Sequence, residues 1–261
     1  MHPVLNIAVQ AARAAGHVII RHINRIDSLT ISNKARNDFV SEVDRMAEAE
    51  IIEVIKKAYP EHSILAEESG LTQGNDFQWV IDPLDGTTNF LYGIPHYAVS
   101  IAMQANGRTE QAVVFDPFKD ELFTASYGAG AWLNNKRIRV SDRRGMENAL
   151  IGTGIPFRPE QDLETYIDTL RVIVPDTAGI RRAGSAALDL AYVAAGRLDG
   201  FWEFSLKPWD MAAGLLLVQE SGGLVGDLHG EQNHWKTGHV LCGTPKVYTE
   251  MKKRLNSVLK Q

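Results

Sequence analysis

Hydrophobic residues return every three or four positions along the first quarter of the chain, which is the spacing of an α-helix. This pattern covers residues 4–23 and predicts an amphipathic first helix that ends near Asn24. A second helical pattern extends from about residue 41 to residue 58 and stops before Pro60, a residue type that ends helices. The polar, irregular residues 33–38 are predicted to form a loop that leads into this second helix.

Short, continuous apolar runs then predict buried β-strands. Residues 63–66 and 78–81 each form such a run, and each leads directly into acidic residues. Between residues 97 and 140 several β-rich runs are separated by turn-forming pairs, with Asn106-Gly107 and Asn134-Asn135 as predicted hairpin turns. Because hairpins join antiparallel strands, the middle of the chain is predicted to be an antiparallel sheet.

From about residue 149 onward, short apolar runs alternate with longer helical patterns. This order is typical of an α/β (α+β layered) protein, in which helices and sheets layer on one another. Because the chain has no low-complexity linker and no internal repeat, we expect one domain over residues 1–261, with sub-halves of about 1–145 and 146–261. The predicted strands are 149–153, 179–182, 200–204 and runs near Leu224 and Val240, and the predicted helices are 161–172, 185–195, 209–221 and one from Pro245.

Composition and charge exclude several classes of protein. The 261 residues are 44% hydrophobic, and the net charge of −5 offers no basic field to nucleic acid, so direct nucleic-acid binding is not expected. We find no signal peptide and no run of about 18 apolar residues, so we expect a cytoplasmic protein that does not enter a membrane. The single cysteine, Cys242, lies in an apolar run and is predicted to be a buried strand residue.

Candidate chemistry is concentrated in the segment that follows residues 78–81. Asp82 and Asp85 stand three residues apart and are followed by Gly86 and a pair of threonines. Carboxylate oxygens suit a hard cation such as Mg²⁺, and a glycine at a helix start lets a phosphate approach the backbone N–H groups. The same residues can also be explained without any ligand, as a turn in which Asp85 caps a short helix.

Two distant segments also place an acid at the end of a strand or the start of a helix. Glu67 and Glu68 follow the strand predicted at residues 63–66, and Asp210 opens the apolar helix predicted after Trp209. A solvated loop and a helix N-cap are the purely structural alternatives for these two segments. Three coincidences of this kind favour a shared acidic site.

These three segments resemble, in order and spacing, the signature motifs of the inositol monophosphatase family. The motifs lie at residues 67–69, 82–88 and 209–214, and the resemblance extends over nearly the whole chain, including residues 3–8 and 184–191. It is closest to the bacterial members of the family. The resemblance implies a sugar-phosphatase fold with alternating αβαβα layers.

The resemblance implies a metal site for two Mg²⁺ ions. Asp82 would bridge the two ions, with Glu67 on the side of the first ion and Asp210 on the side of the second. Two such ions can clamp the attacking and leaving oxygens of a phosphoryl displacement. The implied metal ligands are Glu67, Asp82, the backbone carbonyl of Leu84, Asp85 and Asp210.

The catalytic residues implied by the resemblance are Asp44, Thr87 and Glu67. Water would attack the phosphorus directly, without a phosphoenzyme. The Thr87 hydroxyl would position this water, and Asp44, at the start of the second helix, would orient Thr87.

Substrate contacts also follow from the resemblance. For two of them a structural alternative stays open, because Ala186 can simply belong to a helix start and Glu203 can be a charge on an edge strand. Residues 34–38 resemble a mobile segment that closes over the site in relatives and assists a third metal. The implied substrate-binding residues are Asp85, Gly86, Thr87, the backbone of Ala186, Glu203 and Asp210.

The function implied by the resemblance is Mg²⁺-dependent hydrolysis of a phosphate monoester, with myo-inositol 1-phosphate as the representative substrate and Li⁺ as an inhibitor. A fructose 1,6-bisphosphatase, a histidinol-phosphatase or a 3′-phosphoadenosine phosphatase would keep the metal site and change the pocket, so these activities are alternatives. Relatives are commonly homodimers, and bacterial relatives are associated with transcription antitermination complexes. A homodimer and transcription-complex proteins are therefore the expected protein partners.

Other features are given structural interpretations. The segment Gly152-Thr153-Gly154 lacks the lysine and the spacing of a Walker phosphate loop and is predicted to be a turn. Arg181 and Arg182 are predicted to be a solvated strand end, and His96 a packing residue. No spacing of histidine and cysteine matches a zinc site.

Overall fold

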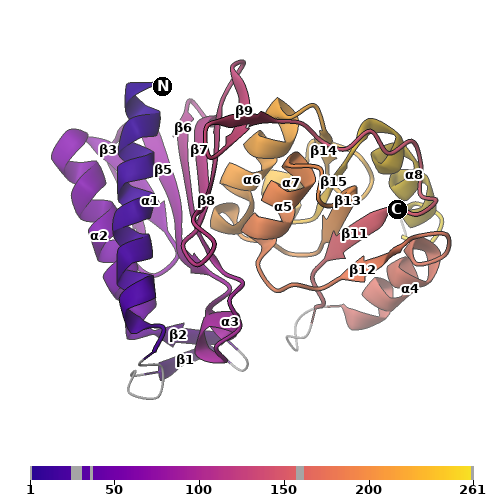
Figure 1. Cartoon of the computed structure of the whole chain (residues 1–261), viewed down its shortest axis with the longest axis horizontal. Helices are drawn as coiled ribbons and strands as arrows, with labels where there is room; N and C mark the ends of the chain where they lie inside the picture. The colour runs from indigo at the N-terminus through magenta and orange to yellow at the C-terminus, as the bar shows by residue number, and fades with distance from the viewer. Residues whose placement is uncertain (1, 25–30, 36–37, 157–161, 260–261) are drawn as a thin grey trace.

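The computed structural model describes residues 2–24, 31–35, 38–156 and 162–259, and its helices and sheets alternate in five layers (Figure 1). The first layer is a helix pair, α1 (Pro3–His22) and α2 (Glu42–Ala58), which pack on each other and on a large sheet. A second helix pair, a smaller sheet and a third helix pair follow. The predicted α/β fold with αβαβα layers is therefore confirmed.

The large sheet has eight strands and contains the β-rich middle of the chain. Neighbouring strands are antiparallel except β3 and β5, which run parallel. The predicted turns Asn106-Gly107 and Asn134-Asn135 join adjacent strands, and all four residues have positive φ, as type I′ turns require. In spatial order the strands are β10 (Lys136–Ile138), β9 (Gly130–Leu133), β8 (Glu121–Ser126), β7 (Arg108–Asp116), β6 (Ala98–Ala105), β5 (Asn75–Asp85), β3 (His62–Ala66) and β4 (Gly70–Thr72).

The central layer is the helix pair α5 (Ala186–Ala194) and α6 (Pro208–Glu220), which lies between the two sheets (Figure 1). Both helices are apolar on nearly every side, which is the pattern of a helix that is buried all round. The core around them takes Val80 from the large sheet and Phe201 from the small sheet. One continuous core therefore joins the two halves of the chain.

The small sheet has five strands and is covered on its outer side by α4 (Leu163–Ile173) and α8 (Pro245–Leu255). Cys242 is fully buried in its strand β15, as the sequence predicted. Two short helices, α3 (Thr87–Leu91) and α7 (His234–Thr237), lie in connections. In spatial order the strands are β12 (Gly179–Arg181), β11 (Leu150–Thr153), β13 (Gly200–Glu203), β15 (Val240–Gly243) and β14 (Leu224–Gly226).

The prediction of a loop at residues 33–38 is wrong in part. The described residues of this region form a hairpin of β1 (Ile31–Ala35) and β2 (Asp38–Ser41), paired antiparallel from Ile31 and Ser41 inward. Polar residues on these strands hide the alternating pattern by which a strand is recognised in a sequence. Arg36 and Asn37, which complete the predicted closing segment, lie outside the described residues.

Helix α1 is, by length and mean hydropathy alone, apolar enough to cross a membrane. It is the one helix of that kind within the described ranges. Its apolar residues, such as Ala11, Ala15 and Ile19, are buried under α2 and the large sheet. This burial is typical of the core helix of a folded domain.

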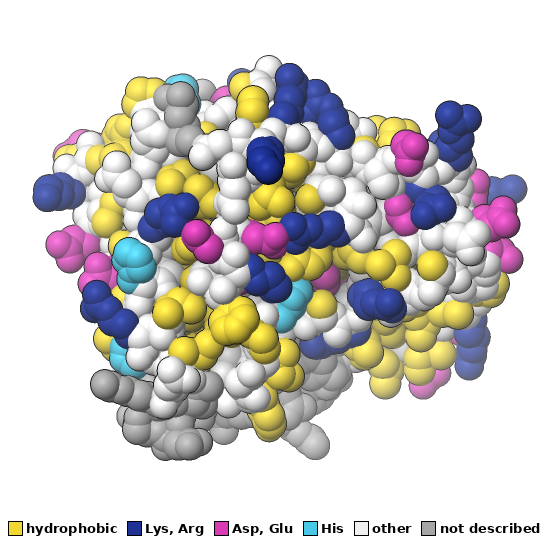
Figure 2. All heavy atoms as spheres, in the orientation of Figure 1, with side chains coloured by type: hydrophobic (Ala, Val, Ile, Leu, Met, Phe, Trp, Pro, Cys, Tyr) yellow, Lys and Arg dark blue, Asp and Glu magenta, His cyan; other side chains and the backbone are white. Residues whose placement is uncertain are grey.

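The face of the molecule shown in Figure 2 carries charged side chains of both signs. Lysine and arginine side chains are scattered among acidic, apolar and neutral ones there, without one continuous basic band.

Candidate active site

The acidic turn is shaped by a β-bulge in strand β5. Asp82 pairs with Ser100 and Asp85 pairs with Ala98, so three steps along β5 oppose two along β6. The strand predicted to end at Ile81 therefore continues through the bulge to Asp85, and the extra residue turns the chain toward α3. Asp82 is only 2% exposed, and its Oδ1 accepts a hydrogen bond from the backbone N–H of Leu84 at 3.0 Å.

Gly86 makes the tight connection from this bulge to α3 possible. It precedes the helix with φ of 101°, a left-handed conformation that favours glycine. A Cβ atom at Gly86 would also lie 2.9 Å from the backbone oxygen of His96. The residue that caps α3 is therefore Gly86, and the alternative in which Asp85 is the helix cap is wrong.

Thr87 and Asp44 are in direct contact, although 43 residues separate them. The Thr87 hydroxyl lies 2.7 Å from Asp44 Oδ1 and 3.0 Å from the carbonyl oxygen of Leu84. Asp44 Oδ2 accepts hydrogen bonds from the Ser41 backbone N–H and hydroxyl as part of the capping box of α2. Burial raises the pKa of Asp44, and the hydrogen bonds from Ser41 and Thr87 oppose that rise.

Asp85 connects the acidic turn to the start of α5. Its Oδ2 accepts hydrogen bonds from the Ser185 hydroxyl at 2.6 Å and from the backbone N–H of Ala187 at 2.7 Å. Ser185 is also the N-cap of α5. The contact from this segment to Asp85 is thus made by Ser185 and Ala187, while Ala186 lies on the cavity wall described below.

Glu67 and Asp210 reach the same region from two other elements. Glu67 follows β3, and its backbone N–H donates to the carbonyl oxygen of Ile81 at 3.1 Å, which places it beside Asp82. Asp210 is the third residue of α6, and its Oδ2 accepts from the backbone N–H of Lys207 at 2.7 Å. Asp210 therefore takes part in capping α6 from inside the helix, and Lys207, not Asp210, is the N-cap.

The four acids Glu67, Asp82, Asp85 and Asp210 disfavour one another's charge. Burial raises the pKa of Asp82 well above its usual value, and the charges of the other three raise it further. Burial is also the main cause that raises the pKa of Asp210. The pKa of Asp85 rises to about 6, because burial outweighs its hydrogen bonds from Ser185 and Ala187. A cation would relieve this repulsion.

The donor set matches Mg²⁺ in kind, since all four side chains offer carboxylate oxygens. Asp82, Asp85 and Asp210 each have one oxygen that makes no hydrogen bond within the described part of the chain. As they lie, however, no three His, Cys, Asp or Glu side chains among the described residues are arranged to hold a metal ion. The ligand chemistry therefore fits a hard cation, and the carboxylates would have to turn to enclose one.

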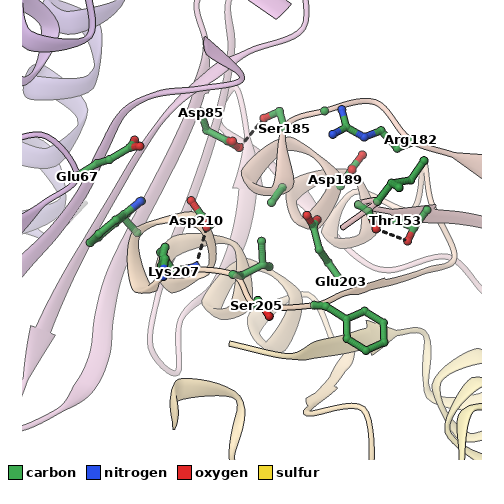
Figure 3. A pocket seen from close by; sticks show the side chains of 17 residues that line it. Glu67, Asp85, Thr153, Arg182, Ser185, Asp189, Glu203, Ser205, Lys207 and Asp210 are labelled. Atoms are coloured by element: carbon green, nitrogen blue, oxygen red, sulfur yellow. Dashed lines mark hydrogen bonds between the residues drawn. The ribbon is translucent and has the colours of Figure 1, made fainter. Parts of the chain in front are cut away.

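A cavity of about 290 Å³ opens beside this acidic cluster, between the central helices and the end of the small sheet (Figure 3). Five of the predicted site residues line it, whereas Asp44, Asp82, Leu84, Gly86 and Thr87 do not. The site therefore has an open part and a part buried behind it. The lining residues that had been predicted are Glu67, Asp85, Ala186, Glu203 and Asp210.

Glu203 lies at the end of β13, a central strand of the small sheet, so its interpretation as an edge-strand charge is wrong. Burial raises its pKa to about 8, with a further rise from the nearby charges of Asp189 and Asp85. In Figure 3 its carboxylate points into the cavity on the side away from Glu67.

Several cavity residues were missed or misassigned from the sequence. Arg182 was predicted to be a solvated strand end but lines the cavity. In the predicted turn Gly152-Thr153-Gly154, the first two residues end β11, and Thr153 and Gly154 line the cavity. Asp189, on α5, was not singled out at all. Its position three residues after Ala186, on the same side of a helix, is the signal that could have found it.

Comparison with known proteins agrees with this geometry. The inositol monophosphatase family matches residues 1–260. A Pseudomonas aeruginosa protein named Nus factor SuhB is 55% identical over 254 residues, which cover 95% of this chain and 94% of that protein. The Nus factor SuhB of Escherichia coli K12 is 53% identical over 253 residues, which cover 96% of this chain and 95% of that protein.

Two solved structures extend the comparison to the fold. The extragenic suppressor protein SuhB from Bartonella henselae matches with a TM-score of 0.96 and 44% identity, covering 99% of this chain and 100% of that one. An IMPase from Thermotoga maritima matches with a TM-score of 0.89 and 34% identity, covering 98% of each chain.

Proposed function

Because the chain belongs to the inositol monophosphatase family, we propose that it hydrolyses a phosphate monoester with the help of Mg²⁺. The observation that carries this proposal is the convergence of four mutually repelling carboxylates, from three separate segments, next to a cavity. Asp82 is almost fully buried and the other three acids are half-buried, so their mutual repulsion costs stability, and a divalent ion at the site would offset that cost.

The proposed metal ligands are the residues that the sequence implies. Bound Mg²⁺ would polarise the phosphate and lower the pKa of the attacking water. In the proposal Asp82 bridges two ions, which agrees with its position as the most enclosed acid of the cluster. The full set is Glu67, Asp82, the carbonyl of Leu84, Asp85 and Asp210.

Thr87 and Asp44 are proposed to position the attacking water. With its hydrogen directed at Asp44 Oδ1, 2.7 Å away, the Thr87 hydroxyl keeps its oxygen lone pairs to accept a hydrogen bond from water. Ser41 fixes Asp44 in turn through two hydrogen bonds. This arrangement supports direct attack by water, without a covalent enzyme intermediate.

The proposed substrate is the phosphate of a sugar alcohol, with myo-inositol 1-phosphate as its representative. The phosphate would lie at the backbone N–H groups of Gly86 and Thr87, beside Asp85 and Asp210. The hydroxyl groups would face Ala186 and Glu203 across the cavity. A cavity of about 290 Å³ suits a small polyol rather than a macromolecule.

Phosphate release from a substrate panel tests the proposal. The purified protein is incubated with myo-inositol 1-phosphate, glycerol 2-phosphate, fructose 1,6-bisphosphate, histidinol phosphate and 3′-phosphoadenosine 5′-phosphate, with Mg²⁺ and with or without Li⁺. We expect the highest kcat/KM with myo-inositol 1-phosphate, and inhibition by Li⁺. Release of phosphate from none of these compounds would show that the protein is not a phosphatase of this class.

The names of the relatives support a second role. Proteins that are 53–55% identical over nearly the whole chain are named Nus factor SuhB, so we propose that this protein also acts in the cytoplasm as a partner in a transcription antitermination complex, in addition to its catalysis. We also propose that the protein forms a homodimer, as the resemblance to the family implies. A pull-down with wild type and Asp82→Asn tests this role, because partner binding should survive the loss of the metal site. Absence of elongation factors and RNA polymerase from both pull-downs would contradict it.

A further inference from the structure

The end of strand β11 leaves room for a carboxyl group. A Cβ atom on Gly154, the residue after β11, would overlap the carboxylate of Glu203. A Cβ atom on Gly152 would meet Leu198 and Phe201 first and would lie 3.6 Å from Cγ of Asp189, an ordinary van der Waals distance. Gly154 therefore leaves the space that the Glu203 carboxylate occupies, and Asp189 lies beside the same strand.

The Asp189 carboxylate faces the cavity. Asp189 is 2% exposed and lines the cavity, and its carboxylate makes no hydrogen bond or ion pair within the described part of the chain, although the charge of Arg182 acts on it. An acid in this position can accept hydrogen bonds from a ligand in the cavity. In Figure 3 the Asp189 carboxylate lies beside Glu203 on the cavity side opposite Glu67.

We propose that Asp189, together with Glu203, binds the hydroxyl groups of the polyol part of the substrate and so selects polyol phosphates that carry several hydroxyls. This inference rests on the proposed phosphatase function and adds a specificity-determining residue to it. The acidic cluster around Asp82 would hold the phosphate end, and the wall formed by Asp189 and Glu203 would hold the alcohol end.

The chemistry of the wall suits hydroxyl groups. Burial raises the pKa of both acids, that of Glu203 to about 8, while the charge of Arg182 opposes the rise. A protonated carboxyl group donates one hydrogen bond and accepts others, as a hydroxyl group also does. Two adjacent carboxyl groups can therefore pair with two hydroxyls of one polyol, whereas glycerol 2-phosphate has fewer hydroxyls and no ring to present them.

The test compares two substrates in the Asp189→Ala variant. We expect kcat/KM for myo-inositol 1-phosphate to fall at least about tenfold more than kcat/KM for glycerol 2-phosphate, the size expected for one lost hydrogen bond to a buried acid. Asp168→Ala, on the exposed face of α4, is the control and should change neither value. Equal losses with both substrates, or no loss, would overturn the inference.

Two further measurements keep the test decisive. Asp189→Asn, which keeps both a donor and an acceptor, should retain the substrate preference, and Asp189→Ser replaces Asp189→Ala if the alanine variant does not fold.

Binding of myo-inositol itself, measured by calorimetry with Mg²⁺ and phosphate present, should also weaken about tenfold in Asp189→Ala. If the wild type binds myo-inositol in this way but releases no phosphate, the proposed function fails and the hydroxyl site stands. If the wild type does not bind myo-inositol, the hydroxyl site fails.

Discussion

At Asp82 the needs of the proposed function and of the stability of the folded protein oppose each other. It is almost fully buried, and burial together with the charges of Glu67, Asp85 and Asp210 raises its pKa. An acid whose pKa is higher in the folded than in the unfolded state destabilises the fold once the pH exceeds the unfolded value, about 3.9. At neutral pH without Mg²⁺, the charge of Asp82 should therefore cost stability.

The first prediction is that Asp82→Asn makes the protein more stable while it removes activity. Asparagine keeps an oxygen that accepts from the N–H of Leu84 but carries no charge. In buffer with EDTA at pH 7 the free energy of unfolding should rise by at least about 1 kcal/mol. This lower bound is smaller than the free energy that corresponds to a shift of one pKa unit. Urea unfolding measures it, with the exposed residue Asp142 changed to Asn as the control. A variant less stable than wild type would contradict this account of the cluster.

His62, outside the candidate site, offers a separate test of how a pKa shift changes the stability of the fold. Its ring stacks between Tyr59 and Phe77, at centroid distances of 4.6 and 5.0 Å, and its Nδ1 accepts from the Trp79 indole N–H at 3.0 Å. Burial, and next the charge of Lys56, lowers its pKa below the usual 6.5. An unprotonated Nδ1 is what the Trp79 hydrogen bond requires.

The second prediction follows from the sign of that shift. Because the folded pKa is depressed, the contribution of His62 is fully present above pH 6.5 and is lost as the pH falls from there through the folded pKa. Wild type should therefore lose more Tm between pH 7.5 and pH 5.5 than His62→Gln, which keeps an acceptor but does not titrate. His17→Gln, exposed on α1, serves as the control. Equal losses of Tm in wild type and His62→Gln would show that the protonation of His62 does not lower the stability of the fold.

At the scale of elements, Asn89 joins the turn that carries the acids to the start of α5. Its side-chain N–H groups donate to the carbonyl oxygens of His96 at 2.8 Å and Ala183 at 2.9 Å, which belong to the two halves of the chain. Ala183 precedes Ser185, and Ser185 donates to Asp85. Asn89 thus holds α3 and the N-terminus of α5 in the relative position that Asp85 requires.

The third prediction concerns this connection. Asn89→Ala should cost about 1 to 3 kcal/mol of stability, because two partly buried carbonyl groups lose their donor. Phosphate release should also fall, since Asp85 would lose its fixed position. Urea unfolding and a phosphate assay measure the two effects, and Asn233→Ala, at an exposed side chain, is the control. Unchanged stability with unchanged activity would mean that Asn89 does not connect the two halves.

The elements were predictable where local sequence decides them. Helix α1 follows from apolar periodicity, and the turns at Asn106-Gly107 and Asn134-Asn135 follow from residues that tolerate positive φ. The bulge in β5 was not predictable, because it depends on pairing with β6 across the sheet. The hairpin of β1 and β2 was missed for a similar reason, since its pairing is not visible in a polar segment.

At the scale of the whole molecule, the candidate site was predictable only in part. Glu67 follows β3, Asp82 lies three residues before the end of β5 and Asp210 is the third residue of α6, so their motifs are visible near element ends in the sequence. Asp189 and Arg182 carry no such motif, and only the packing of α5 against the small sheet brings them to the cavity. The contact of Thr87 with Asp44 was expected from the resemblance, and their separation of 43 positions in the sequence hides it from any local pattern.

The fourth prediction tests the central claim that the acids of this site bind the Mg²⁺ needed for phosphate release. Phosphate release from myo-inositol 1-phosphate is measured as Mg²⁺ is raised from zero, in wild type, in Asp82→Asn and in the control Asp142→Asn. The account predicts no release without Mg²⁺, saturable activation in wild type and the control, and loss of at least about a thousandfold in kcat/KM for Asp82→Asn, as when an essential catalytic group is removed. Release that is independent of Mg²⁺, or that persists in folded Asp82→Asn, would contradict it.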